Sequence, residues 1–169
     1  MVRKANMELN TQPLPLTRTA RTTRFGQVRY RDDEAFDFRW GLPGFPALRR
    51  FVVLTVGAQK PFVWLQSLEK PDVAIPLVDP WTIFEDYDPK LPAATSAVLE
   101  IDRADDFCMM CVTVVGDGAA DFSVNLLAPI VFNLRTRVAR QVMLEDSDYA
   151  VRTPVPRTFG GTREEATPA

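Results

Sequence analysis

The sequence is divided into short apolar runs, rich in valine, isoleucine, phenylalanine and threonine, which are separated by clusters of proline, glycine and aspartate. Few runs reach the length of a helix, and this pattern is typical of β-strands. The candidate strands are residues 26–31, 36–40, 50–56, 62–67, 73–78, 97–101, 107–115, 122–127, 130–133, 141–144 and 149–152. They lie too close together for parallel crossovers, which need about a dozen residues each. The sheet is therefore predicted to be mainly antiparallel.

The remaining local signals complete the predicted fold. Residues 107–127 are expected to form a hairpin, because Gly116 and Gly118 lie between two strand-forming runs and permit positive φ. Helix is expected only in short pieces, at residues 47–50 and 104–107. A chain of 169 residues that is 46% hydrophobic builds one core, and closure of the sheet would remove its exposed edges. The predicted fold is mainly β, a single-domain antiparallel β-barrel-like fold with one or two short helices.

The charge is unevenly distributed along the chain. Residues 1–24 carry five basic residues against Glu8 and so have a net charge of +4, whereas residues 153–169 are neutral. Since the whole chain has a formal net charge of −2, residues 25–152 carry −6. Both ends lack a sustained apolar period, so residues 1–24 are predicted to be a disordered basic arm and residues 153–169 a flexible tail.

Several classes of function are disfavoured by composition. The chain has no histidine, which excludes Ser-His-Asp and Cys-His catalysis and imidazole metal ligands. Cys108 and Cys111 form a CxxC, but residues three apart on a strand point to opposite faces, so their sulfurs do not converge. No apolar stretch has the length of a membrane span or signal peptide, and two cysteines suit a reducing cytoplasm. We expect a cytoplasmic, monomeric protein without enzymatic activity, cofactor or metal.

An acidic stretch between residues 79 and 106 is the main candidate for a binding surface. It contains eight acidic residues, among them Asp86 and Asp88 on either side of Tyr87, against Lys90 and Arg103. A solvated loop and an acidic docking patch for a basic partner both explain this composition. The basic arm lacks interleaved aromatic residues, so no direct contact with nucleic acid is expected.

Two apolar segments have unusual polar neighbours. In residues 62–67 the side chains of Phe62, Trp64 and Gln66 share one face, with Trp64 expected in the core. In residues 125–133 a proline interrupts an apolar run that is bracketed by asparagines. Because proline cannot donate to a strand ladder, a break or bulge is expected there, with the asparagines bonding local backbone.

The order of these segments resembles the flagellar assembly factor FliW family, from about Arg24 to about Val155. RFGQVRY and FRWGLPGFPALRRFVVL resemble the family's opening and its glycine-rich turn, and PFVWLQSLEKPDVAIPLVDP resembles its central strand pair. YDPKL resembles the following loop, SVNLLAPIVFN is the closest match, and RQVMLEDSDYAVRTPV resembles the closing segment. The resemblance makes residues 25–152 a FliW-like β domain.

The resemblance implies a regulatory protein that binds the C-terminal region of flagellin and the RNA-binding translational repressor CsrA. Export of flagellin would free the factor to antagonise CsrA, so that flagellin synthesis follows export. The candidate residues follow from this resemblance. Partner-binding roles are expected for Asp86, Tyr87, Asp88, Asn125, Ala128, Pro129 and Asn133, and structural roles for Gly41, Gly44, Phe45, Trp64 and Gln66. The alternative function is a small-ligand-binding β-barrel, which would need an empty apolar cavity between its strands.

Overall fold

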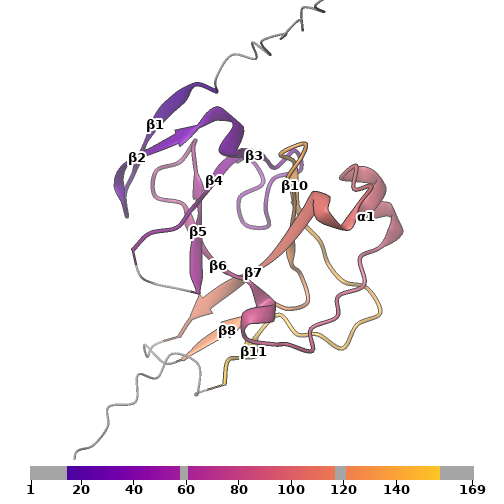
Figure 1. The fold of residues 1–169 in the computed structure, drawn as a ribbon. Helices are drawn as coiled ribbons and strands as arrows, with labels where there is room; N and C mark the ends of the chain where they lie inside the picture. The colour runs from indigo at the N-terminus through magenta and orange to yellow at the C-terminus, as the bar shows by residue number, and fades with distance from the viewer. Residues whose placement is uncertain (1–14, 58–60, 117–120, 157–169) are drawn as a thin grey trace, which may run out of the picture.

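The fold is built almost entirely from short strands (Figure 1). The computed structural model describes residues 15–57, 61–116 and 121–156. The strands are β1 (Thr17–Thr22), β2 (Gly26–Arg31), β3 (Ala35–Asp37), β4 (Arg50–Leu54), β5 (Phe62–Ser67), β6 (Ala74–Val78), β7 (Phe107–Val115), β8 (Phe122–Val124), β9 (Ile130–Asn133), β10 (Ala139–Gln141) and β11 (Thr153–Pro154). One α-helix, α1 (Ala93–Val98), and three 3-10 turns, Asp32–Glu34, Pro80–Thr82 and Ala104–Asp106, complete the described elements.

The strands form one large sheet and one separate hairpin. In the large sheet the main path runs β10-β9-β7-β6-β5-β4-β3, with β8 paired to β7 and β11 to β8, while β1 and β2 pair only with each other. Every ladder between these strands is antiparallel. The mainly β, antiparallel prediction is confirmed, as is the β7–β8 pairing of the predicted hairpin; the tip of that hairpin lies outside the described residues.

The sheet does not close into a barrel, so the barrel-like prediction holds for the antiparallel fold but not for closure of the sheet. The two ends of the sheet path, β3 and β10, meet only through an isolated parallel bridge between Asp37 and Val138, where the Asp37 amide donates to the Arg137 carbonyl at 2.7 Å. Both end strands are three residues long. They are therefore too short to continue this bridge as a ladder, and the sheet stays open between them.

The interior is filled by aromatic and aliphatic side chains. Phe38, Phe51 and Phe132 are fully buried, and the Phe38 ring meets Phe51 edge-on with 4.9 Å between centroids. Leu65, Leu77 and Ile130 belong to the same cluster and have no exposed surface. An interior packed in this way argues against a small ligand held between the strands.

The outer face of the sheet is covered by two different segments. At one end, the turn of the β1–β2 hairpin lies on β5, where Phe25 meets Trp64 edge-on at 5.5 Å. At the other end, Tyr87 packs with Val78 of β6 and Cys111 of β7 in a second buried cluster. Between the hairpin and the loop that contains Tyr87, a row of half-buried side chains crosses β4, β5 and β6.

Three local predictions are wrong. Residues 97–101 do not form a strand, because the segment belongs to α1 and to the turn after it, where Glu100 has a φ of 54°. Residues 47–50 form no helix, because Ala47 belongs to a turn and Arg50 already begins β4, and residues 149–152 are irregular. The predicted helix at residues 104–107 is a 3-10 turn at Ala104–Asp106. In segments of four or five residues, the sequence pattern does not distinguish a strand from a short helix or a turn.

The expected boundaries of the domain also differ from the structure. Thr17–Thr22, within the predicted arm, forms β1 and pairs with β2 in six register positions. Thr153–Pro154, within the predicted tail, pairs with β8. Residues 1–14 of the predicted arm and residues 157–169 of the predicted tail lie outside the described residues.

Within the described ranges, none of the helices has both the length and the apolar character needed to cross a membrane.

Candidate functional site

Two adjoining hollows lie on the surface beside Tyr87. The first, of about 350 Å³, is lined by apolar side chains with Glu85 and Asp86 at its rim. The second, of about 360 Å³, is lined by Asp88, Glu145, Asp146, Asp148, Ser147 and Lys90. Tyr149 lines both hollows, so they adjoin at this side chain. We call the two hollows together the acidic groove, because six carboxylates and one ammonium line them.

Tyr87 forms the floor of the acidic groove and is 4% exposed. Its hydroxyl donates a hydrogen bond to the Leu126 carbonyl at 2.8 Å, and its own carbonyl accepts from the Trp81 indole N–H at 2.8 Å. Burial, with the neighbouring Cys111 thiol as a smaller contribution, raises the pKa of Tyr87 far above its usual value. The phenol therefore stays a neutral hydrogen-bond donor, which fixes the loop against the sheet.

Tyr149 connects the closing segment of the chain to the acidic loop. Its ring lies 4.8 Å from that of Tyr87, and its hydroxyl accepts a hydrogen bond from the Asp88 amide at 2.8 Å. Ile83, Phe84 and Leu126 supply the apolar lining nearby. The groove therefore combines an aromatic floor with a rigid, hydrogen-bonded rim.

The rim presents its carboxylates to solvent. Asp86 and Asp88 are both exposed, and Asp88 pairs only with Lys90, at 2.6 Å, within the described part of the chain. The loop starts at Asp79, whose carboxylate accepts from the Trp81 amide at 3.0 Å, and Pro80 begins the 3-10 turn that follows. The acidic loop is thus held at its base and charged at its tip.

The segment around Pro129 is held from two sides. The Asn125 side-chain oxygen accepts from the Ala128 amide at 3.0 Å, and the Gln141 side chain donates to the Ala128 carbonyl at 2.9 Å. Ala128 and Pro129 are buried and Asn125 is half-buried. Leu126 next to them lines the acidic groove, and the hydrogen bonds of Asn125 and Gln141 fix the backbone of this segment.

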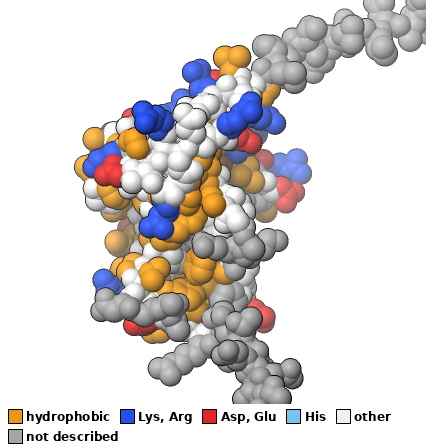
Figure 2. All heavy atoms as spheres, turned by 90° about the vertical axis from the view of Figure 1, so that its left-hand side faces the viewer, with side chains coloured by type: hydrophobic (Ala, Val, Ile, Leu, Met, Phe, Trp, Pro, Cys, Tyr) orange, Lys and Arg blue, Asp and Glu red, His pale blue; other side chains and the backbone are white. Residues whose placement is uncertain are grey.

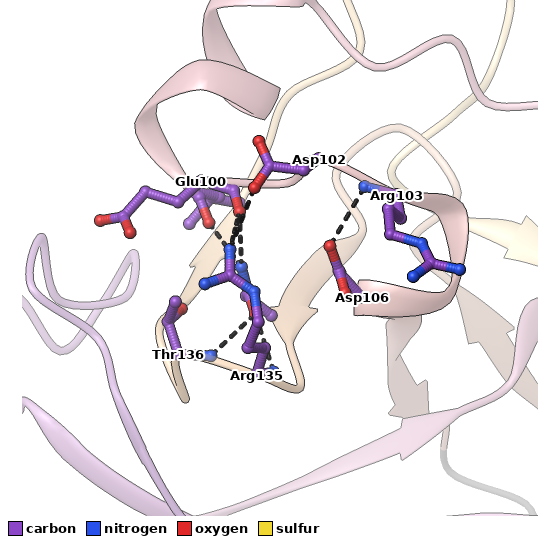
Figure 3. A network of polar contacts seen from close by, with 8 residues as sticks. Glu100, Asp102, Arg103, Asp106, Arg135 and Thr136 are labelled. Atoms are coloured by element: carbon purple, nitrogen blue, oxygen red, sulfur yellow. Dashed lines mark hydrogen bonds and ion pairs between the residues drawn. The ribbon is translucent and has the colours of Figure 1, made fainter.

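Asn133 is fully buried at the end of β9. Its amide nitrogen donates to the carbonyls of Leu99 at 2.7 Å and Glu100 at 3.2 Å, and its oxygen accepts from the amides of Arg135 and Thr136, each at 2.9 Å. Figure 3 shows the same region, where Arg135 also reaches the Glu100 carbonyl and Asp102. Asn133 can therefore affect a partner only through the turns that it joins.

The residues expected to be structural occupy constrained positions. Gly41 has a φ of 69°, and a Cβ there would lie 2.6 Å from the Pro46 carbonyl oxygen. Gly44 has a φ of 85°, and Phe45 bonds back to Leu42 through an isolated bridge. At both glycines a side chain would be strained, because left-handed backbone disfavours a Cβ.

Gln66 and Trp64 share the outer face of β5 as predicted, but only Gln66 is buried there. The Gln66 side-chain amide donates to the carbonyls of Ser67 and Val73 at 2.9 and 3.1 Å. Trp64 is half-buried, so its placement in the core was wrong; it lies under the hairpin turn on the outer face of the sheet. Periodicity placed the side chain on the right face, but it could not show that a hairpin covers that face incompletely.

The two cysteines point to opposite faces of β7, as the spacing predicts. Cys108 is exposed and Cys111 is buried. Burial raises the pKa of the Cys111 thiol to about 12. In the described part of the chain no three acidic or cysteine side chains lie close enough together to hold a metal ion.

Part of the acidic groove was not found from the sequence. Glu145, Asp146 and Asp148 lie about 60 residues after the acidic loop, and their contribution depends on the fold. The sequence predicted only a strand at residues 149–152, and this prediction does not indicate that Tyr149 lies beside the acidic loop.

Comparison with known proteins identifies the family. The FliW protein family model matches residues 19–155. The chain belongs to the FliW family. It is 35% identical to the flagellar assembly factor FliW of Bacillus licheniformis over 135 residues, which is 80% of this chain and 94% of the relative. The identity is 33% to the Bacillus subtilis protein of the same name, over 79% of this chain and 94% of the relative.

A crystal structure of the flagellar assembly factor FliW has the same fold. It superposes with a TM-score of 0.75 at 28% identity and covers 81% of this chain and 96% of that chain. The residues matched to the family include β1 from Thr19, the whole acidic groove and β11. The FliW fold thus includes strands at both ends that composition alone had placed outside the domain.

Proposed function

We propose that this chain is a non-enzymatic cytoplasmic flagellar assembly factor. It binds the C-terminal region of flagellin and a CsrA-type RNA-binding regulator, and so couples flagellin synthesis to export. Membership of the FliW family supports the general role. The observation that supports partner binding is the acidic groove, with its aromatic floor and rigid carboxylate rim.

The charge of the groove suits a basic partner. Six carboxylates line it against Lys90 alone, and Asp86 and Asp88 are exposed at its edge. A protein that binds RNA phosphates presents clustered lysine and arginine side chains, and complementary charge raises the rate of association. The apolar floor at Phe84 and Leu126 adds contact area that a purely electrostatic surface lacks.

Binding kinetics test this proposal. Reversing the charge with Asp86→Lys and Asp88→Lys is expected to slow association with purified CsrA at least several-fold and to lower its dependence on salt, while the urea midpoint is unchanged. Asp105→Lys, an exposed carboxylate outside the groove, is the matched control and keeps wild-type kinetics. If the double variant binds at the wild-type rate with the same salt dependence, the acidic groove is only a solvated surface.

Binding to flagellin is tested separately, with a peptide of the flagellin C-terminal region. The groove variants and the control are titrated with this peptide, and then with CsrA in its presence. The proposal expects the peptide to shift the apparent affinity for CsrA, because a factor that links synthesis to export must respond to both partners. An affinity for CsrA that is independent of saturating flagellin peptide contradicts the proposed coupling.

A further inference from the structure

Three arginines of the β1–β2 hairpin lack an acidic partner. Arg21, Arg24 and Arg29 have no carboxylate within 4.0 Å among the residues that the structure describes, whereas the other two arginines of the hairpin each pair with an aspartate of the following turn. Asp72, which lines a hollow beside Arg24, is itself 3.7 Å from Lys70. Among the described residues, the hairpin therefore presents three arginines that no carboxylate pairs with.

Arg24 is held in a fixed orientation by Trp64. The guanidinium carbon lies 4.4 Å above the centre of the indole ring, and Phe25 meets the same ring edge-on at 5.5 Å. Stacking of this kind fixes the plane of the guanidinium and leaves its N–H donors directed outward along their edges. No side-chain hydrogen bond from Arg24 occurs in the described ranges. A preorganised, unsatisfied guanidinium is a receptor for a carboxylate.

An apolar row begins next to this guanidinium. Trp64 pairs with Leu54 on β4 and with Pro76 on β6, so the three side chains cross the outer face of the sheet side by side. All three are half-buried, as is Phe62 two residues along β5. Figure 2 shows hydrophobic side chains in a band below the hairpin, with lysine and arginine side chains around it.

We propose that this face docks an acidic, amphipathic peptide segment of a protein partner. One carboxylate of the segment binds the edge of Arg24, and an adjacent apolar side chain packs on Leu54 and Pro76, on either side of the Trp64 ring that Arg24 covers. Arg21 and Arg29 add long-range attraction for further acidic residues. This surface is distinct from the acidic groove, and the inference does not depend on the proposed function.

The apolar row favours a peptide over a nucleic acid. A phosphate backbone needs a continuous basic track, and bases need open aromatic faces. Here the arginines border aliphatic and proline side chains, and the accessible face of Trp64 is covered by Arg24.

The three tryptophans allow each surface to be observed separately. Trp64 reports the proposed site, Trp81 lies beside Tyr87 at the acidic groove, and Trp40 stacks under Arg140 elsewhere. Their indole N–H signals are recorded in ¹⁵N-labelled protein and assigned with single Trp→Phe variants. The probe is a synthetic peptide of about twelve residues in which pairs of glutamates alternate with single leucines; a second peptide has glutamine in place of glutamate.

The proposal expects the acidic peptide to shift the Trp64 signal in a saturable way and to leave Trp40 and Trp81 unchanged, while the glutamine peptide has little effect. Shifts at Trp81 alone, or no saturable shift at Trp64, would overturn it. Loss of CsrA binding at the groove does not affect this result, so failure of the proposed function and failure of this inference are distinguishable.

Arg24→Gln tests the contact directly. Since a charge-assisted hydrogen bond is removed, the dissociation constant for the acidic peptide should rise about tenfold or more. Arg103→Gln removes an equal charge from an exposed position on another surface, and it should change the constant less than twofold. If both variants weaken binding of the acidic peptide equally, the effect comes from net charge alone and the site is refuted. Displacement of the peptide by a short oligouridine RNA would instead assign the surface to nucleic acid.

Discussion

Replacement of Asn133 by alanine should destabilise the protein strongly, because this one side chain joins two turns that are far apart in the sequence. The side chain has no exposed surface and makes four hydrogen bonds, two as donor and two as acceptor. These bonds join the turn after α1 to the turn between β9 and β10. Asn133→Ala removes all four at once and adds no new partner.

The expected loss follows from which groups stay unsatisfied. The Glu100 carbonyl keeps the bond from the Arg135 guanidinium at 2.8 Å, and the Arg135 amide belongs to an exposed residue that water reaches. The Leu99 carbonyl and the Thr136 amide are less accessible and lose their partner. An unsatisfied buried group costs about 1 to 3 kcal/mol, and the cost is smaller for the amide of the half-buried Thr136, so we expect a total loss of about 2 to 4 kcal/mol.

Urea denaturation measures this loss, as a lower midpoint with an unchanged slope. Thr136→Val is the matched control in the same turn, because the Thr136 hydroxyl is buried without a hydrogen-bond partner and its removal costs little. Amide hydrogen exchange at Glu100 and Ile101 should accelerate in Asn133→Ala only. A loss below about 1 kcal/mol, or an equal loss in both variants, would show that Asn133 does not hold the two turns together.

Three further predictions concern other parts of the molecule. Asn125→Ala removes one hydrogen bond and should cost about 1 kcal/mol, with flagellin affinity falling only as the folded fraction falls; lost binding at an unchanged melting temperature would contradict this structural role. A chain that starts at residue 25 lacks β1 and should have a lower urea midpoint than one that starts at residue 15; equal midpoints would show that β1 adds no stability. Above pH 9 the Cys111 thiol ionises in the unfolded state, whereas in the folded state it keeps its proton up to about pH 12. The free energy of unfolding should therefore fall by up to about 1.4 kcal/mol per pH unit in this range, and Cys111→Ala should make this fall less steep. The same pH dependence in Cys111→Ala and wild type would contradict the prediction.

The strands that the sequence predicted well share a strong local signal. Residues 62–67, 107–115 and 130–133 match β5, β7 and β9 at both ends. Each is a run of branched or aromatic residues between breakers, so local preference and tertiary packing agree. Residues 97–101 were predicted as a strand, but Pro92 before them caps the helix α1, which includes the first two of these residues, and Glu100 within them has a positive φ. The run therefore spans the end of a helix and a turn, which its composition does not show.

The acidic groove was predictable only in part. Asp86 and Asp88 were identified because acidic residues are dense in one continuous stretch of sequence, and Tyr87 because the YDPKL segment resembles a loop of the family. The other half of the groove comes from residues 145–149, and the hydrogen bond between Asp88 and Tyr149 spans 61 positions. No local pattern contains a contact of that separation. Likewise, Arg24 looked like part of a disordered arm until the hairpin turn placed it on Trp64.

The uneven charge of the sequence becomes a separation in space. The basic hairpin covers one end of the outer face of the sheet, and the acidic loop covers the other end. The β5–β6 ladder connects the two ends. Trp64 pairs with Pro76 on the side of the hairpin, and two residues further along Phe62 pairs with Val78, which belongs to the same buried cluster as Tyr87. The two proposed surfaces therefore share a sheet but no binding residue. On the two proposals, partners of opposite charge contact different residues, so antagonism between them would come from steric overlap or from a change in the protein rather than from competition for one set of residues.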